Sequence, residues 1–193
     1  MNKDPVAKNA GQLRPIQSVQ WLPAERLGRL NMDSRVRSWL LGKGLTTLRM
    51  KSACGERFAA RLVDQWSGKL EGSHLSPLRV NDGAGLFRDV ELCCGDQVWV
   101  FEQSIIPDST LTANSWLAEL GDTGIGETLA SLSKLERSSY EYAWLPVRQP
   151  VTARALREAE VRPAGLWTRR HRVALRGAPL LIQELFLPVV GRT

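Results

Sequence analysis

One carboxylate lies inside the most apolar segment of this chain, near its C-terminal end. Glu184 is the single acidic residue of residues 180–187. A turn with glycine and proline precedes this segment and Pro188 follows it, which indicates a strand buried on both faces. Alternation along the strand places Glu184 with Ile182 and Phe186. A buried carboxylate needs a cation or hydrogen-bond donors, or it keeps its proton, so Glu184 is a candidate catalytic residue.

Arg88 is the cationic counterpart of Glu184 in another predicted strand. It shares a strand face with the apolar residues Leu86, Val90 and Leu92. An arginine on such a face is either ion-paired in the core or directed at an anion, because its guanidinium group can bind a carboxylate through two parallel hydrogen bonds. The residues alone leave both interpretations open: a structural Arg88–Glu184 pair, or a site for an anionic ligand.

A third candidate is the glycine-flanked residue Ile125, in Gly124-Ile125-Gly126. Glycines at the start of a helix leave backbone N–H groups free, and these groups attract an anion. The alternative interpretation is an ordinary turn.

Four motifs follow one another along the chain between about Trp21 and Pro188. They are Arg88-Asp89-Val90-Glu91-Leu92; Ile105-Ile106-Pro107 with Ser109-Thr110-Leu111; Leu120-Gly121-Asp122-Thr123-Gly124-Ile125-Gly126; and Leu166-Trp167-Thr168-Arg169-Arg170-His171 with the strand at residues 180–188. In order and approximate spacing, this series resembles the motifs of the chorismate pyruvate-lyase family. Each motif is unspecific by itself, and the resemblance rests on the four together.

The resemblance implies an activity and a set of site residues. The family eliminates pyruvate from chorismate to give 4-hydroxybenzoate, the first committed step toward ubiquinone, with no cofactor and no metal. The residue matching Arg88 binds the carboxylate of the ring, and the residue matching Glu184 faces the ring hydroxyl. Backbone amides at the positions of Ile125 and Arg35 donate to the same carboxylate. The resemblance thus implies Glu184 and Arg88 as catalytic residues, and Arg35, Arg88, Ile125 and Glu184 as substrate-binding residues.

Two positions depart from the best-known family members. Arg35 stands where they have methionine in a flap, and Gln103 stands where they carry an arginine near the buried site. Strand alternation places Gln103 with Trp99 and Ile105. Because Gln103 lacks the positive charge, we expect a weaker field on an anionic substrate, with partial compensation by Arg35.

The remaining pattern predicts an α+β fold. Strands are expected over residues 45–52, 58–66, 86–94, 98–106 and 139–145 and in a hairpin over 166–187; helices are expected over 23–30, 34–41, 112–120 and 127–133. Residues 67–84 are expected to form a loop or lid, and residues 148–164 an irregular, partly helical excursion. Strands joined mainly by hairpins indicate an antiparallel sheet. The resemblance implies a single six-stranded sheet with helices on one side and helical flaps over an internal ligand site.

Length and composition indicate one soluble domain. With 193 residues, the chain is long enough for one sizeable core. We expect a flexible N-terminal segment at residues 1–20 and a single domain over 21–193. No apolar run approaches the roughly 20 residues that cross a bilayer, and the N-terminus lacks a signal-like apolar core. We therefore expect a cytoplasmic protein without a membrane span.

Charge, cysteine and histidine content limit which partners, disulfides and metal sites can be expected. The formal net charge of +6 suits either an anionic partner or simple solubility. The basic cluster at residues 169–172 would divide between two strand faces, and no nucleic-acid-binding motif is present, so we expect no nucleic-acid partner. Cys54 stands alone and Cys93 and Cys94 are adjacent, so no structural disulfide is expected. The histidines at positions 74 and 171 lack further ligands at metal-binding spacing.

The alternative function is a non-catalytic module of the same fold that binds a small aromatic acid. Effector-sensing domains of one class of bacterial regulators have a similar fold, but they follow a winged helix of roughly 60–70 residues. Here about twenty residues precede the first predicted core helix, which favours an enzyme. The resemblance also favours a monomer, with chorismate as substrate and 4-hydroxybenzoate and pyruvate as products.

Overall fold

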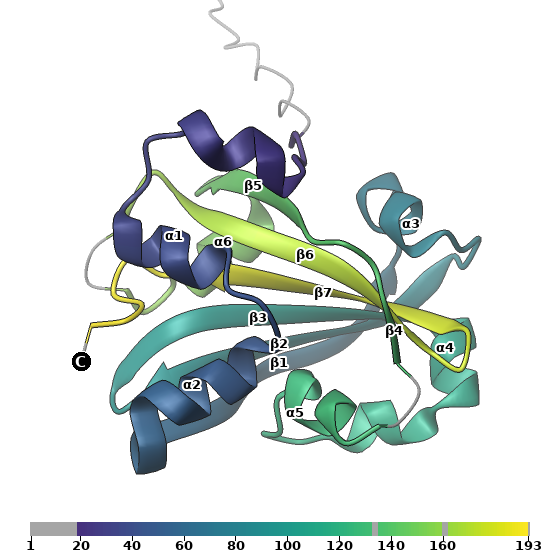
Figure 1. The fold of residues 1–193 in the computed structure, drawn as a ribbon. Helices are drawn as coiled ribbons and strands as arrows, with labels where there is room; N and C mark the ends of the chain where they lie inside the picture. The colour runs from purple at the N-terminus through teal and green to yellow at the C-terminus, as the bar shows by residue number, and fades with distance from the viewer. Residues whose placement is uncertain (1–18, 133–134, 160–161, 193) are drawn as a thin grey trace, which may run out of the picture.

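The fold is built on one antiparallel sheet (Figure 1). The computed structural model describes residues 19–132, 135–159 and 162–192. Its strands are β1 (Phe58–Lys69), β2 (Ala84–Cys94), β3 (Gln97–Pro107), β4 (Leu135–Arg137), β5 (Glu141–Pro146), β6 (Gly165–Leu175) and β7 (Ala178–Phe186). Their order is β1-β2-β3-β7-β6-β4, with β5 also paired to β6. The α+β antiparallel prediction is confirmed.

The predicted number of six strands is wrong, because the sheet has seven. The short strand β4 pairs with residues 173–175 of β6, whereas β5 pairs with residues 165–170 of the same strand. Since β4 and β5 use different halves of β6, both fit along one edge of the sheet.

The predicted hairpin over 166–187 forms, and the predicted strands at 86–94 and 98–106 form a second hairpin, β2–β3. The β2–β3 turn contains Gly95 at a φ of +61°, and the β6–β7 turn contains Arg176 and Gly177 at φ values of +52° and +88°. Two consecutive residues with positive φ give the tight turn whose twist matches that of paired strands. The β6–β7 hairpin carries Glu184, so this turn fixes its register.

Helices cover both faces of the sheet, not one as predicted. The inner face carries Val90, Leu92 and Phe186 and lies under α1 (Ser34–Leu40), α2 (Thr46–Cys54) and α5 (Ile125–Ala130). The outer face carries Phe87, Phe101 and Leu185 and packs against α3 (Gly72–Leu78) and α6 (Pro150–Ala155). Figure 1 shows α1 in front of the strands and α6 behind them. The α4 helix (Asp108–Ala113) follows β3 directly, and three 3₁₀ helices span Ala24–Arg29, Gly55–Arg57 and Ser115–Glu119.

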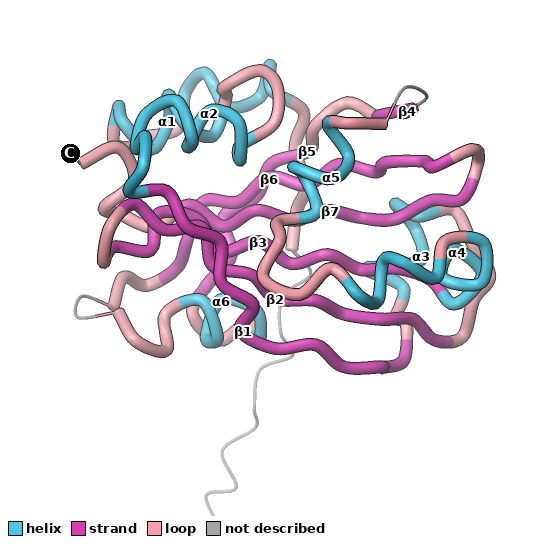
Figure 2. Tube along the Cα trace, turned by 90° about the horizontal axis from the view of Figure 1, so that it is seen from below, coloured by secondary structure: helices cyan, strands magenta, loops and turns pink. Residues whose placement is uncertain are grey.

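The predicted strand at residues 45–52 is instead the helix α2. Its buried residues are Thr46, Thr47, Met50 and Cys54, while Leu48 is 50% exposed. This spacing of three to four residues is the period of a helix packed on one side. Figure 2 shows α1 and α2 together on one side of the sheet.

The prediction of no disulfide is also wrong. Cys54 and Cys94 are joined, with their Cα atoms 5.5 Å apart, and Cys93 is free and buried. Cys54 ends α2 and Cys94 ends β2, so two residues 40 positions apart meet at the same end of the sheet. Strand alternation turns Cys93 away from that contact.

Residues 67–84 are more ordered than the predicted loop. β1 continues to Lys69, and α3 begins after Glu71, whose backbone N–H donates to His74 Nδ1 at 3.1 Å. The Glu71 side chain in turn accepts a hydrogen bond from the backbone N–H of His74, so the two residues form a capping box. Such a reciprocal cap starts a helix even in a polar sequence. Most of the predicted N-terminal segment, residues 1–18, lies outside the described residues, and no described helix is long and apolar enough to cross a membrane.

Candidate active site

Two neighbouring rows of polar side chains cross the inner face beneath α2 and α5. In the first row, Glu102 of β3, Glu184 of β7 and Arg169 of β6 lie directly opposite one another. In the second row, Arg88 of β2 lies opposite Ser104 of β3. None of these five residues is more than 3% exposed. Charged residues are rarely buried unless they are paired or functional, so this region is the strongest candidate for chemistry.

Arg169 holds Glu184 in place. Its Nε donates to Glu184 Oε2 at 2.5 Å. Its other nitrogens donate to the carbonyls of Leu40 and Gly42, at 3.2 and 2.6 Å, and to Thr46 Oγ1 at 2.6 Å. One guanidinium group therefore orients the carboxylate and fastens the connection between α1 and α2 to the sheet. The sequence indicated Arg169 only as part of a basic cluster.

Arg88 does not pair with Glu184. Its Nε donates to Gln65 Oε1 at 3.1 Å, and its Nη2 donates to the backbone carbonyls of Gly121 and Thr123. Arg88 and Glu184 lie two strands apart, on β2 and β7, and two residues out of line, which corresponds to about 12 Å between their backbones at ordinary strand spacing and rise. Of the two interpretations of Arg88, the structural pair with Glu184 does not form.

Several polar atoms of the inner face are buried without a hydrogen-bond partner among the described residues. They are Arg88 Nη1, Glu102 Oε1, Ser104 Oγ, both ring nitrogens of His171, and Thr47 Oγ1. Buried polar atoms are almost always paired, and a cluster of exceptions calls for an explanation. A polar ligand bound between Arg88 and Glu184 would supply the missing partners.

Glu102 is a site residue that the sequence analysis missed. Burial raises the pKa of its carboxyl to about 8, the charge of Glu184 adds to the effect, and Arg88 opposes it. Burial would also raise the pKa of Glu184, but Arg169 outweighs it and holds that pKa below its usual value. The site therefore combines a protonated carboxyl and an ionised one at neutral pH. The signal that could have found Glu102 is its position in the predicted strand over 98–106, where alternation places it on one face with Ser104.

The raised pKa of Glu102 predicts a loss of stability as the pH rises. The folded protein holds this proton up to a pH of about 8, whereas an unfolded chain releases it near 4.5. The folded state thus binds more protons between these values, so the free energy of unfolding falls as the pH rises through that window. Between pH 5 and 8, we expect the free energy of unfolding of the parent to fall by on the order of 3 kcal/mol more than that of Glu102→Gln. Urea unfolding at both pH values measures this, and equal losses in the two proteins would contradict it.

Ile125 begins α5, as predicted, and is fully buried beside this site. Its backbone N–H lowers the pKa of the Glu102 carboxyl, against the larger effect of burial. A Cβ on Gly126 would lie 3.1 Å from Thr47 Oγ1, so the glycine lets α5 approach α2 closely. An ion pair of 2.5 Å between Lys51 and Glu127 also joins the two helices. The two helices therefore form a joined cover over this part of the inner face.

Arg35 lies apart from the other predicted site residues. Its backbone N–H donates to Asp33 Oδ1 at 2.8 Å, and Asp33 is the N-cap of α1. Its guanidinium group is half-exposed and pairs with the same carboxylate at 3.3 Å. The amide expected to bind a ligand is thus engaged within its own helix turn.

The expectation that Gln103 lies near the buried site is wrong. Gln103 is on the outer face, where its Nε2 donates to Asp89 Oδ1 at 2.8 Å. It shares that face with Phe101 and Ile105, but not with Trp99, which packs on the inner side. A register shift between β2 and β3 at Leu92 and Cys93 interrupts the alternation that placed Trp99 with Gln103.

This separation reverses one expectation about function. Arg35 and Gln103 lie over opposite faces of the sheet and share no partner. We therefore expect the effects of Arg35→Met and Gln103→Arg on kcat/KM to add, within about 0.5 kcal/mol. A double-mutant cycle measures the coupling, and rescue of one substitution by the other would contradict this expectation.

Comparison with known proteins identifies the family. The chain matches the family described as chorismate lyase over residues 15–192. It belongs to the chorismate lyase family. The match includes both polar rows of the inner face and the helices that cover them.

Named relatives of the chorismate lyase family align over most of the chain. A protein of Pseudomonas aeruginosa named probable chorismate pyruvate-lyase is 33% identical, over 87% of this chain and 90% of its own. One of Methylococcus capsulatus with the same name is 32% identical, over 79% and 94%. The chorismate pyruvate-lyase of Salmonella arizonae is 30% identical, over 92% and 93%.

The fold also occurs outside the chorismate lyase family. A solved structure described as a GntR-family transcriptional regulator matches with a TM-score of 0.52 and 14% sequence identity, over 75% of this chain and 60% of that chain. At this identity the likeness concerns the fold alone.

Proposed function

We propose that this protein is a chorismate pyruvate-lyase, which converts chorismate into 4-hydroxybenzoate and pyruvate. The observation that carries the proposal is the buried arrangement of Arg88, Glu102 and Glu184 with unpartnered polar atoms between them. Membership of the chorismate lyase family and the names of the relatives support it. As part of the same proposal, the protein acts as a cytoplasmic monomer at the first committed step toward ubiquinone.

The proposed substrate spans the two polar rows. Its ring carboxylate binds the free Nη1 of Arg88 and the backbone N–H of Ile125, and its ring hydroxyl faces Glu184. A backbone separation of about 12 Å between residues two strands apart and two residues out of line suits a six-membered ring with one polar group at each end. The Arg35 amide joins this set only if Asp33 releases it, so its role depends on a movement of α1.

The two carboxyls of the site suit an elimination. Two titratable groups whose surroundings drive their pKa values apart form an acid and base pair. We propose that ionised Glu184 accepts the proton from the ring carbon that bears the hydroxyl. The electrons of that bond complete the aromatic ring, the bond to the enolpyruvyl oxygen breaks, and protonated Glu102 gives its proton to that oxygen. Enolpyruvate then becomes pyruvate, and proton transfer from Glu184 back to Glu102 restores the site.

The direct test incubates the purified protein with chorismate. We expect 4-hydroxybenzoate and pyruvate to form in equal amounts, both followed by chromatography. Binding of 4-hydroxybenzoate without any turnover would instead favour a non-catalytic module that binds aromatic acids. Neither turnover nor binding would contradict the proposed function.

A further inference from the structure

The outer face carries a polar row of its own, directly behind the inner row of Glu102, Glu184 and Arg169. Gln103 of β3 lies opposite Gln183 of β7, which lies opposite Arg170 of β6. Each is the sequence neighbour of a residue of the inner row, namely Glu102, Glu184 and Arg169. The structure thus presents a different set of side chains on the other side of the same three strands.

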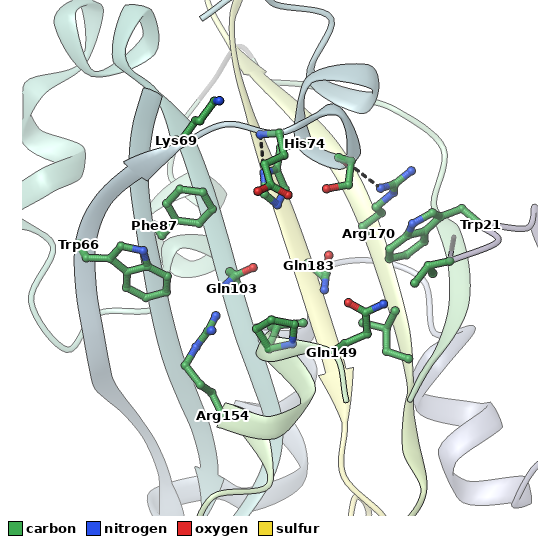
Figure 3. A pocket seen from close by; sticks show the side chains of 16 residues that line it. Trp21, Trp66, Lys69, His74, Phe87, Gln103, Gln149, Arg154, Arg170 and Gln183 are labelled. Carbon is green, nitrogen blue, oxygen red and sulfur yellow. Dashed lines mark hydrogen bonds between the residues drawn. The ribbon is translucent and has the colours of Figure 1, made fainter. Parts of the chain in front are cut away.

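A cavity of about 290 Å³ lies over this outer row. Figure 3 shows the amides of Gln103 and Gln183 next to each other on its floor. The two residues are only 5% and 8% exposed. Neutral amides that are nearly buried and still face a cavity can donate and accept hydrogen bonds, which is how small-molecule sites orient a ligand.

Aromatic side chains form the walls of the cavity. Trp66 and Phe87 stack with ring centroids 5.3 Å apart, and the His74 ring meets Phe87 edge-on at 5.4 Å. Burial lowers the pKa of His74, so its ring is neutral at pH 7. Trp21 closes the opposite side (Figure 3). Flat aromatic walls favour a flat ligand.

Two arginines border the cavity, and neighbouring groups fix both in position. Arg154 donates through Nε to Asp89 at 2.6 Å and lies 4.9 Å from the Trp66 ring. Arg170 donates through Nε to Glu141 at 2.9 Å and lies 3.8 Å from the Trp21 ring. Figure 3 shows the two guanidinium groups on different sides of the floor amides. Cations held in place in this way bind an anion at a lower entropic cost.

The lining carries more positive than negative charge. Its cations are Lys69, Arg154 and Arg170, and Glu71 is its one carboxylate among the described residues. Asp89 and Glu141 offset the charges of the two arginines, but they are not part of the lining, so the cavity is faced by the guanidinium groups and not by these two carboxylates. An anion is therefore favoured over a cation.

We propose that this outer cavity is a second ligand site, separate from the inner face, for a flat aromatic carboxylate of one or two rings. The aromatic walls bind the ring, the amides of Gln103 and Gln183 orient it, and one of the two arginines, Arg154 or Arg170, binds the carboxylate. A volume of about 290 Å³ is at the small end of the range for ligand pockets, which fits a ligand of this size. The proposal does not depend on the lyase activity.

The test measures binding of 2-naphthoate, a fluorescent flat carboxylate, to the full-length protein. Gln183→Glu keeps the shape of the floor but adds a negative charge, and Gln149→Glu adds one at the start of α6 with little risk to folding. Arg148→Gln removes an exposed charge outside the lining as a matched control, and Arg88→Ala alters only the inner site. The neutral 2-naphthamide keeps the rings and lacks the charge.

We expect saturable binding of 2-naphthoate to the parent below 1 mM. The two added carboxylates should each weaken it about tenfold or more, and 2-naphthamide should bind about tenfold more weakly, as expected when a charged partner is lost. Arg148→Gln should bind like the parent, and Arg88→Ala should retain the binding of 2-naphthoate that the two glutamate substitutions weaken. Absence of binding, unchanged binding in both glutamate variants, or loss of binding in Arg88→Ala would overturn the proposal. The chorismate assay on the same parent protein decides the proposed function independently.

Discussion

Replacing Glu184 by glutamine is expected to abolish most of the lyase activity. Glutamine keeps the shape and hydrogen bonding of the side chain but cannot accept a proton, and loss of such a group typically costs about 100- to 10,000-fold in rate. The substitution also leaves the buried Arg169 without its carboxylate. Breaking a buried ion pair costs up to about 3–5 kcal/mol of stability. The measurement is kcat with chorismate, alongside urea unfolding to show that the variant is folded under the assay conditions.

A neighbouring ion pair supplies the control for this prediction. Glu141→Gln removes the carboxylate that binds Arg170 at 2.9 Å. Arg170 is on β6, as is Arg169, but its side chain lies on the outer face of the sheet. We expect its activity with chorismate to stay within about twofold of the parent, because the inner face is untouched. Parent-like turnover in folded Glu184→Gln would sink the assignment of Glu184 as the proton acceptor.

Replacing Arg88 by alanine is expected to weaken binding of the aromatic acid more than it harms the fold. Loss of a buried, charge-assisted contact costs about 2–5 kcal/mol, which corresponds to roughly 30- to 4,000-fold in affinity. Both KM for chorismate and Kd for 4-hydroxybenzoate should rise. Calorimetric titration with 4-hydroxybenzoate gives the second value without any need for turnover.

Arg61→Ala is the matched control for Arg88→Ala. Arg61 lies on the neighbouring strand β1 and binds Glu91, and its side chain is 58% exposed. We expect Arg61→Ala to bind 4-hydroxybenzoate like the parent. Equal affinities in the parent and in Arg88→Ala would show that Arg88 serves only to hold the loop carbonyls of Gly121 and Thr123.

Strand alternation predicted the parts of the site that depend on local pattern. It placed Arg88 and Glu184 on buried strand faces, and the structure confirms both positions as nearly fully buried. It also divided Arg169 and Arg170 between two faces, where they now bind Glu184 and Glu141. These inferences succeed because alternation is a property of each strand alone.

Strand alternation could not predict which residues of different strands lie opposite one another, because this depends on strand order and register. The sequence left open whether Arg88 is the partner of Glu184, and the order β3-β7-β6 brings Arg169 beside it instead. Glu102 escaped notice because its importance lies in its position opposite Glu184, which depends on the β3–β7 register. The register shift in the β2–β3 pair breaks the alternation that placed Trp99 with Gln103. The wrong expectation that Gln103 lies near the buried site came from the family resemblance, not from the strand pattern.

The central claim is that the aromatic acid binds on the inner face between Arg88 and Glu184. An experimental structure of the protein with 4-hydroxybenzoate at neutral pH tests it most directly. We predict the ligand carboxylate within hydrogen-bond distance of Arg88 and the ring hydroxyl within hydrogen-bond distance of Glu184, beneath α2 and α5. A ligand with no contact to either residue, or one found only over Gln103 and Gln183 on the outer face, would contradict the account.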